Sequence, residues 1–170
     1  MELYNHMAYG LSLTQQMKLF KDYVTKSFHK APNSDTLASI SNQLSNIHYP
    51  ILVAIDGRDS TFEDNEAEAL LKKPQYFFML LTPAKQDDPS DILLAQETCE
   101  KNALQIQAKM IKDSRDYSNG LTGLLISTFT IASIGPIGDN LYGVIMGFRL
   151  EHGIEYKVIA EYWNEETPNP

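Results

Sequence analysis

The sequence predicts a single α+β domain over residues 1–170, with a mixed, largely antiparallel sheet of about four to five strands packed by two main helices. Three observations predict this class. Apolar residues recur every three or four positions within residues 12–29 and again within 88–113, which is the helical period. Two short apolar runs lie between those segments, and the period changes to two after residue 124.

The first main helix is expected over residues 12–29. Ser12 and Gln15 have the spacing of a capping box, in which the two side chains satisfy backbone N–H groups of the first turn. Pro32 ends the pattern because proline cannot continue the helical hydrogen-bond ladder. Residues 1–11 are expected to form a flexible end. The apolar stripe consists of Leu13, Met17, Phe20, Val24 and Phe28.

Two strands are expected at the centre of the sheet. The run from Tyr49 to Ile55 is almost entirely apolar and rich in β-branched residues, which favours a strand buried on both faces. A second run, Tyr76–Thr82, lies between Pro74 and Pro83. Residues 56–73, between the two runs, are polar and acidic, and we expect them to form a connection.

The second main helix is expected over residues 88–113. Asp88 suits the N-cap position, and Pro89 suits the first helical position, where its missing N–H costs nothing. A helix of roughly 24 residues spans about 36 Å, which is enough to cross a sheet. Small residues in its apolar stripe allow a close approach to that sheet. The stripe consists of Ile92, Ala95, Cys99, Ala103, Ile106 and Met110.

The C-terminal part is expected to form antiparallel strands. Residues 124–131 are rich in β-formers, and the glycine and proline cluster at 135–140 indicates a turn. Apolar and other residues then alternate through 142–150. His152-Gly153 is expected to reverse the chain into a last strand, Ile154–Trp163. Residues 164–170 are expected to form a flexible end.

Composition restricts the classes of partner. The chain has 14 basic and 22 acidic residues, a net charge of −8, and its lysines are scattered. Binding to nucleic acid or to an anionic membrane surface is disfavoured, because both need a cluster of basic residues. Cys99 is the only cysteine, so no intramolecular disulfide is possible. No secretory signal and no apolar span long enough for a membrane are recognised.

No catalytic residue, metal site or cofactor is expected. The acidic stretch 56–68 does not have the register of a calcium-binding loop, because Thr61 and Ala67 stand where glycine and glutamate are needed. The four histidines are dispersed. Cys99 lies in the apolar stripe of the second helix, which indicates a buried, inert thiol.

Some residues are candidates for a protein interface. Ile145 and Ile159 lie on the face of the last two expected strands opposite the main apolar face. Tyr156, Tyr162 and Trp163 are of types enriched at interfaces. These side chains contact a partner or a second copy of the chain, or they complete the core of the monomer. The sequence favours neither alternative.

The order of elements provides a further indication. An amphipathic helix precedes the strand that begins Tyr49-Pro50-Ile51-Leu52-Val53. A second strand, the helix 88–113 and an antiparallel pair after Ile134-Gly135-Pro136 follow. This order, over Leu13 to Leu150, resembles that of the small tail-terminator and tail-completion (minor tail) proteins of tailed phages and prophages.

The resemblance implies a non-enzymatic ring subunit that caps the tail tube and meets the head connector, in the host cytoplasm or in the virion. Members of the family assemble as hexamers through sheet edges and loops. The acidic loop 56–68 is then a candidate contact for a basic partner surface, with Asp59 and Glu63 as the residues to test. The expected strand Ile154–Trp163 is an addition to the simplest pattern of the family.

Two other classes of function stay open. A small binding module would hold a ligand or peptide at the sheet, in an apolar pocket with a few convergent polar groups. An enzyme could assemble its site from residues that lie far apart in the sequence.

Overall fold

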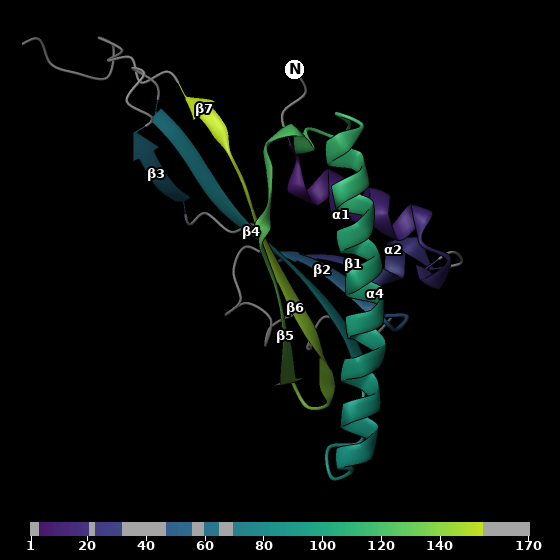
Figure 1. Cartoon of the computed structure of the whole chain (residues 1–170). Coiled ribbons are helices and arrows are strands. Elements are labelled where there is room, and N and C mark those ends of the chain that lie inside the picture. Colours follow the sequence, from purple (N-terminus) through teal and green to yellow (C-terminus); the bar gives the residue numbers. More distant parts are fainter. Residues whose placement is uncertain (1–3, 21–22, 32–46, 56–59, 65–69, 155–170) are drawn as a thin grey trace, which may run out of the picture.

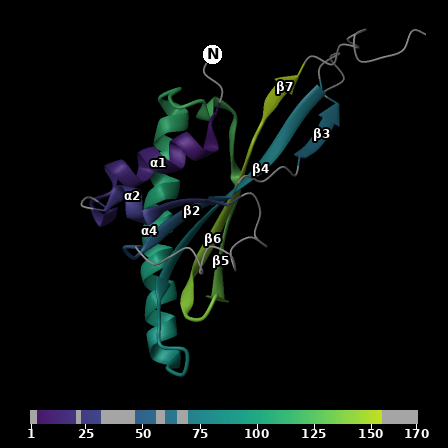
Figure 2. The same ribbon diagram turned by 180° about the vertical axis from the view of Figure 1, so that it is seen from behind.

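The computed structural model describes residues 4–20, 23–31, 47–55, 60–64 and 70–154. They form a mixed, largely antiparallel sheet of seven strands with the helices on one face, as Figures 1 and 2 show from opposite sides. The expected α+β class is confirmed, and the number of strands exceeds the expected one. The helices are α1 (His6–Gln16), α2 (Val24–Ser27) and α4 (Pro89–Arg115), with 3₁₀ turns at Lys18–Phe20 and Leu121–Gly123. The strands are β1 (Phe28–Ala31), β2 (Ile51–Ile55), β3 (Ser60–Asp64), β4 (Leu70–Pro83), β5 (Leu124–Ile137), β6 (Leu141–Leu150) and β7 (His152–Ile154).

The expected first helix, residues 12–29, is wrong in its bounds. α1 begins at His6, capped by the Asn5 side chain, whose Oδ1 accepts a hydrogen bond from the backbone N–H of Ala8 at 3.0 Å. Residues 6–11, expected in a flexible end, therefore belong to this helix. It ends at Gln16, and the predicted helix continues as a 3₁₀ turn, the single turn of α2 and the strand β1.

The physical reason lies in the second half of the predicted helix. Residues 23–25 are aromatic or β-branched, and such residues lose side-chain freedom in a helix. Phe28–Ala31 gains a parallel ladder with β2 instead. The apolar stripe still identified core residues correctly, because Leu13 and Phe20 are both buried.

The two expected central strands are confirmed. All five residues of β2 are buried. β2 pairs with β4 in an antiparallel register that runs from Ile51 opposite Leu81 to Ile55 opposite Phe77. β4 is longer than expected, since it begins at Leu70, inside the predicted connection 56–73. That connection also contains β3, which pairs with the first part of β4.

The second main helix is confirmed within two residues. Its N-cap is Asp88, whose Oδ1 accepts hydrogen bonds from the backbone N–H groups of Ser90 at 3.0 Å and Asp91 at 3.2 Å. Ala95, Cys99 and Ala103 are buried on the side facing the sheet. Burial raises the pKa of the Cys99 thiol to about 11, which agrees with the inert thiol that the sequence predicts.

The turn between β5 and β6 is shorter than expected. Strand β5 extends through Gly135 and Pro136 to Ile137, so that residues 138–140 form the turn. The register shifts between Ile134 and Ile137. Gly135 lies there with φ of 132°, and a Cβ at this position would come within 2.5 Å of the Tyr142 ring. Glycine is therefore needed where the two strands change register.

The expected chain reversal at His152-Gly153 is wrong. These residues lie in β7, which pairs with β4 from Lys72 opposite His152 to Leu70 opposite Ile154. β6 and β7 thus pair with successive parts of β4, which is long enough to accommodate both. Beyond Ile154, the expected strand Ile154–Trp163 lies outside the described residues.

The sheet buries apolar side chains on both faces. On one face, α1 and α4 cover the side chains of β2, β4 and β6 that include Leu52, Phe78 and Phe148. On the opposite face, a second cluster includes Val53, Met79 and partly buried side chains around them. Among the described helices, none is long and apolar enough to cross a membrane.

Candidate assembly surfaces

The structure describes two of the seven residues expected at an interface. Glu63 lies on β3 and Ile145 on β6. The other five lie outside the described residues, so their expected role stays a prediction. They are Asp59, Tyr156, Ile159, Tyr162 and Trp163.

Glu63 was expected in an acidic loop and is found in a strand. Its carboxylate forms an ion pair with Lys73 on β4, and the Lys73 ammonium also lies 3.3 Å from Oε2 of Glu151. The hydrogen bond with Glu63 and the one with Glu151 raise the pKa of Lys73 above its usual value. Glu63 is thus engaged within the monomer, although its side chain remains exposed to solvent.

Ile145 lies on the sheet face opposite the helices, as its alternation predicts. It is half-buried and packs against the second apolar cluster. This position fits a residue that completes the monomer's own core. The alternative role at a subunit interface stays a prediction.

A three-stranded arm extends from the body of the sheet. It consists of β3, residues 70–74 of β4, and β7, and it projects beyond the helices in both views (Figures 1 and 2). One face of the arm is polar, because Glu63, Lys73 and Glu151 pair there. Beside them, the Arg149 guanidinium donates to Oγ1 of Thr61 at 2.8 Å and to Oε1 of Gln75 at 2.9 Å.

The other face of the arm carries Phe62, whose side chain is 56% exposed. Phe62 lies opposite Lys72 on β4, and Lys72 lies opposite His152 on β7, so the three side chains share this face. Burial and the charge of Lys72 lower the pKa of His152. Sequence reasoning missed Phe62, because one aromatic residue within an acidic stretch has no periodic signal. The segment Ser60–Asp64 holds a single apolar residue, so no alternation indicated the strand.

Strand β5 forms an edge of the described sheet. None of its 14 residues is charged, and it pairs with β6 at Leu124–Leu125, Thr130–Ile134 and Ile137. Thr130–Ile134 pairs regularly with β6, between two shifts in register. Exposed side chains in this segment include Ala132 and Ser133. The segment therefore presents backbone N–H and C=O groups beside uncharged side chains.

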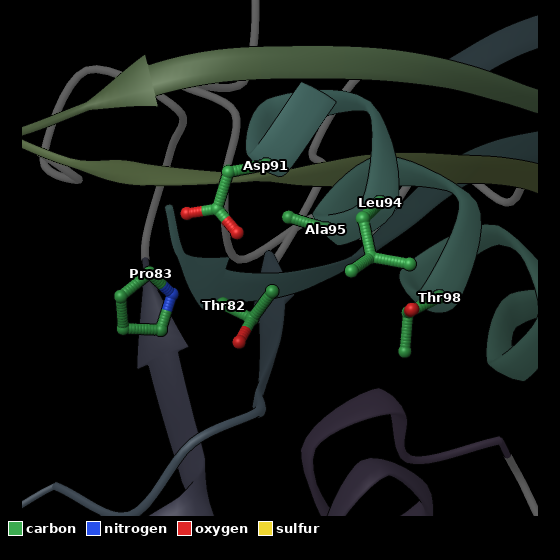
Figure 3. A pocket seen from close by; sticks show the side chains of 6 residues that line it. All are labelled: Thr82, Pro83, Asp91, Leu94, Ala95 and Thr98. Atoms are coloured by element: carbon green, nitrogen blue, oxygen red, sulfur yellow. The ribbon is translucent and has the colours of Figure 1, made fainter. Parts of the chain in front are cut away.

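An open groove of about 210 Å³ lies between the end of β4 and the first turns of α4 (Figure 3). Leu94, which is 60% exposed, and the Asp91 carboxylate point from the helix toward the end of the strand. Asp91 also accepts a hydrogen bond from the backbone N–H of Lys85 at 2.8 Å. The lining residues are Thr82, Pro83, Asp91, Leu94, Ala95 and Thr98.

The groove and the edge of β5 lie at the same end of the molecule. The Gln96 side chain, on the same helical turns as the groove residues, donates to the carbonyl oxygen of Ile134 at 3.4 Å. A partner bound along β5 would therefore lie near the groove. This proximity has no signal in the sequence, because the helix and the strand are far apart along the chain.

A buried polar cluster connects α1 to the C-terminal end of α4. The Tyr9 hydroxyl donates to Oδ2 of Asp113 at 2.8 Å. The Asp113 carboxylate also pairs with Lys109 and accepts from the Asn119 side chain at 3.3 Å. The pKa of Tyr9 is raised well above its usual value. Burial is the main cause, and the hydrogen bond to Asp113 is the second. With its partners satisfied, this cluster serves to hold α1 against α4.

His6 connects the start of α1 to the sheet. Its Nε2 lies 2.9 Å from the carbonyl oxygen of Phe77, and because a carbonyl can only accept, Nε2 donates. Its Nδ1 lies 2.9 Å from the Tyr4 hydroxyl. The His6 ring also packs 4.3 Å from the Phe78 ring, measured between centroids. Burial raises the pKa of Tyr4.

Within the described residues, no three His, Cys, Asp or Glu side chains gather as metal ligands. In comparisons with protein-family models, with characterised proteins and with solved structures, nothing matches this chain.

Proposed function

We propose that this protein is a non-enzymatic assembly subunit of a phage or prophage tail, a tail terminator or head–tail completion protein that joins copies of itself into a ring. Its other partners would be proteins of the tail tube or the head connector. The observation that supports the proposal is the uncharged edge of β5.

The edge of β5 lacks a protection that edge strands of self-contained domains commonly have. An exposed edge can pair with another chain, and natural proteins discourage this with lysine or other charged residues. β5 contains no lysine or other charged residue along its 14 residues. The register shifts on each side of Thr130–Ile134 bend the strand, but they leave this segment regular. It is therefore the part of the edge that suits pairing with a neighbouring subunit.

The element order is the second support for this reading. An N-terminal helix, two central strands, the long α4 and the β5–β6 pair follow one another in the order that resembles the tail-completion family. In that arrangement, a ring would form by sheet-edge contacts between identical subunits.

A second candidate function rests on the same edge. A binding module could add an extended peptide to β5 through main-chain hydrogen bonds. The two candidates differ in what occupies the edge, which is a copy of this chain in one and a different peptide in the other. The state of association of the pure protein separates them.

The test is the solution mass of the full chain by light scattering over a wide range of concentration, with electron microscopy of any large species. Ala132→Lys places a charge on the edge, and Ala108→Lys places the same charge on an exposed position of α4. We expect ring-shaped particles of one defined mass, formed by the pure protein or on addition of tail tubes. Ala132→Lys should weaken association at least tenfold, or about 1.4 kcal/mol, and Ala108→Lys should leave it unchanged.

A wild-type protein that stays monomeric at all concentrations, and also in the presence of tail tubes, would exclude the ring-subunit proposal. Equal loss of association in both lysine variants would show that charge, rather than the β5 edge, controls assembly. A monomer that binds extended peptides at β5 would favour the binding module.

A further inference from the structure

A ring needs more contact than the edge of β5 provides. Stable protein interfaces bury about 1,200 Å² or more, and the short regular segment Thr130–Ile134 falls short of such an area. A neighbouring subunit must therefore also contact another surface. The arm and the groove are the two described features with the shape and exposure to supply it.

The arm presents one aromatic side chain to solvent. Phe62 is more than half exposed, whereas the other face of the arm is occupied by ion pairs and hydrogen bonds. Large aromatic side chains in such positions are the usual anchors of protein interfaces, because they bury much area at little entropic cost. Phe62 thus has the character of an anchor without a pocket in its own subunit.

The groove has room for such an anchor. Its volume is about 210 Å³, whereas a cavity of roughly 150 Å³ already accepts a benzene molecule. Its walls are formed by the apolar side chains of Pro83, Leu94 and Ala95, with two threonine side chains between them. A phenyl ring seated there would cover Leu94, which is otherwise largely exposed.

The charges beside the two features are complementary. Lys72 lies next to Phe62, and among the described residues no acidic side chain pairs with it. The groove carries Asp91 in its lining, with Asp87 and Glu97 exposed nearby. Two copies of a chain with net charge −8 repel each other, so an orientation that places Lys72 against these carboxylates is favoured over others.

The arm cannot fill the groove of its own subunit. Strand β4 begins in the arm and ends at the groove, and its length from Lys72 to Pro83 is roughly 35 Å at about 3.3 Å per residue. The contact must therefore join two copies. Because it uses a different surface on each copy, it repeats from subunit to subunit and closes into a ring when the rotation allows.

From this geometry we propose that Phe62 of one copy inserts into the groove of the next copy, between Pro83 and Leu94, with Lys72 beside Asp91. This inference rests on the proposed function, since it names the contact between neighbouring ring subunits. It identifies a second copy of this chain as the occupant of the groove.

The test joins the two surfaces covalently. In a Cys99→Ala background, one preparation carries Ser60→Cys, two residues from Phe62 on the same strand, and a second carries Thr98→Cys at the groove, so that Phe62 and Leu94 are kept. The two are mixed and treated with a short bis-maleimide linker. The control pairs Ser60→Cys with Leu104→Cys, an exposed position of the same helix outside the groove. We expect a cross-linked dimer in the first mixture at least tenfold more abundant than in the control mixture or in either preparation by itself.

A charge exchange tests the same contact without cross-linking. Lys72→Glu and Asp91→Lys should each weaken association about tenfold, and the double variant should recover most of the loss. Circular dichroism checks that each variant is folded.

The possible failures are distinct. If the wild-type protein forms rings but Ser60→Cys links equally to Thr98→Cys and to Leu104→Cys, or if charge exchange gives no recovery, the arm-in-groove contact is wrong and the ring proposal stands. If the wild-type protein forms no ring with or without tail tubes, the proposed function fails first.

Discussion

The close approach of β6 to β4 at Gly143 predicts a large effect for a small substitution. Gly143 pairs with Leu81, and a Cβ at Gly143 would lie 1.9 Å from the carbonyl oxygen of Leu80. Ordinary contact begins at 3.4 Å, so Gly143→Ala requires the two strands to separate by about 1.5 Å, the difference between these distances. The atom in the way belongs to the backbone, so no side-chain rotation relieves the clash.

The cost follows from that separation. Moving the strands by this amount stretches the neighbouring N–H···O contacts beyond hydrogen-bond length. Two lost backbone hydrogen bonds at about 1 kcal/mol each, with about 1–3 kcal/mol of strain, give a loss of roughly 3–5 kcal/mol. Typical domains have a free energy of unfolding of about 5–15 kcal/mol. For a chain of this length, the melting temperature should fall by roughly 6–20 °C.

The control is Gly153→Ala on β7, where an added Cβ meets nothing within 4 Å. We expect this variant to unfold within about 0.5 kcal/mol of the wild type. Urea unfolding followed by circular dichroism measures the free energies of unfolding, and calorimetry measures the melting temperatures. A Gly143→Ala protein within about 1 kcal/mol of the wild type would refute the packing of β6 on β4 described above.

Three further predictions concern side chains inside the monomer. Tyr9→Phe removes a hydrogen bond to the buried Asp113 carboxylate and should lower the free energy of unfolding by about 2 kcal/mol in urea titrations. Cys99 should react with a maleimide at pH 8 much more slowly in the folded protein than in denaturant, because burial raises its pKa to about 11, and equal rates would contradict its burial. His152 should titrate below pH 6.5 in NMR spectra and move back toward this value in Lys72→Gln. As the pH falls, the unfolded chain binds a proton at His152 at a higher pH than the folded protein does. The contribution of His152 to stability is therefore full above pH 6.5 and declines as the pH falls toward the folded pKa.

The control for the first of these is Tyr117→Phe. The Tyr117 side chain is 78% exposed, and its loss of a hydroxyl should change the free energy of unfolding by less than about 0.5 kcal/mol. Equal losses in the two tyrosine variants would show that the contact between Tyr9 and Asp113 contributes nothing specific.

The central part of the fold could be predicted from the sequence, because its signals are local. The apolar run Ile51–Ile55 is too short for a helix and is bounded by turn residues, and it forms β2. Asp88 and Pro89 mark the start of α4 within the chain itself. These elements need no knowledge of their neighbours in space.

The N-terminal helix could not be bounded in this way. Spacings of three and four along the stripe from Leu13 to Phe28 mark residues that face the core, but they do not require one helix. Phe28 instead begins a strand, because β2 offers a parallel partner that lies 24 residues further along the chain, from Phe28 to Leu52. Pairing between distant segments overrode the local pattern.

The candidate surfaces were the least accessible to sequence reasoning. Glu63 is expected at an interface because of its charge, and in the structure that charge is paired with Lys73. Phe62, its neighbour in the sequence, is exposed because β4 carries β3 beyond the helices. The groove depends on α4 beginning beside the end of β4. Neither feature has a sequence pattern of its own.

Strand β4 belongs to both the arm and the body, and this continuity determines how the molecule would carry a mechanical load. A pull on the arm runs lengthwise along β4 and acts as a shear on its pairing with β2 and β6. Backbone hydrogen bonds that lie across the direction of a pull resist it together, instead of opening one after another. A subunit built in this way would transmit tension from a neighbour into its most buried strands before its edges yield.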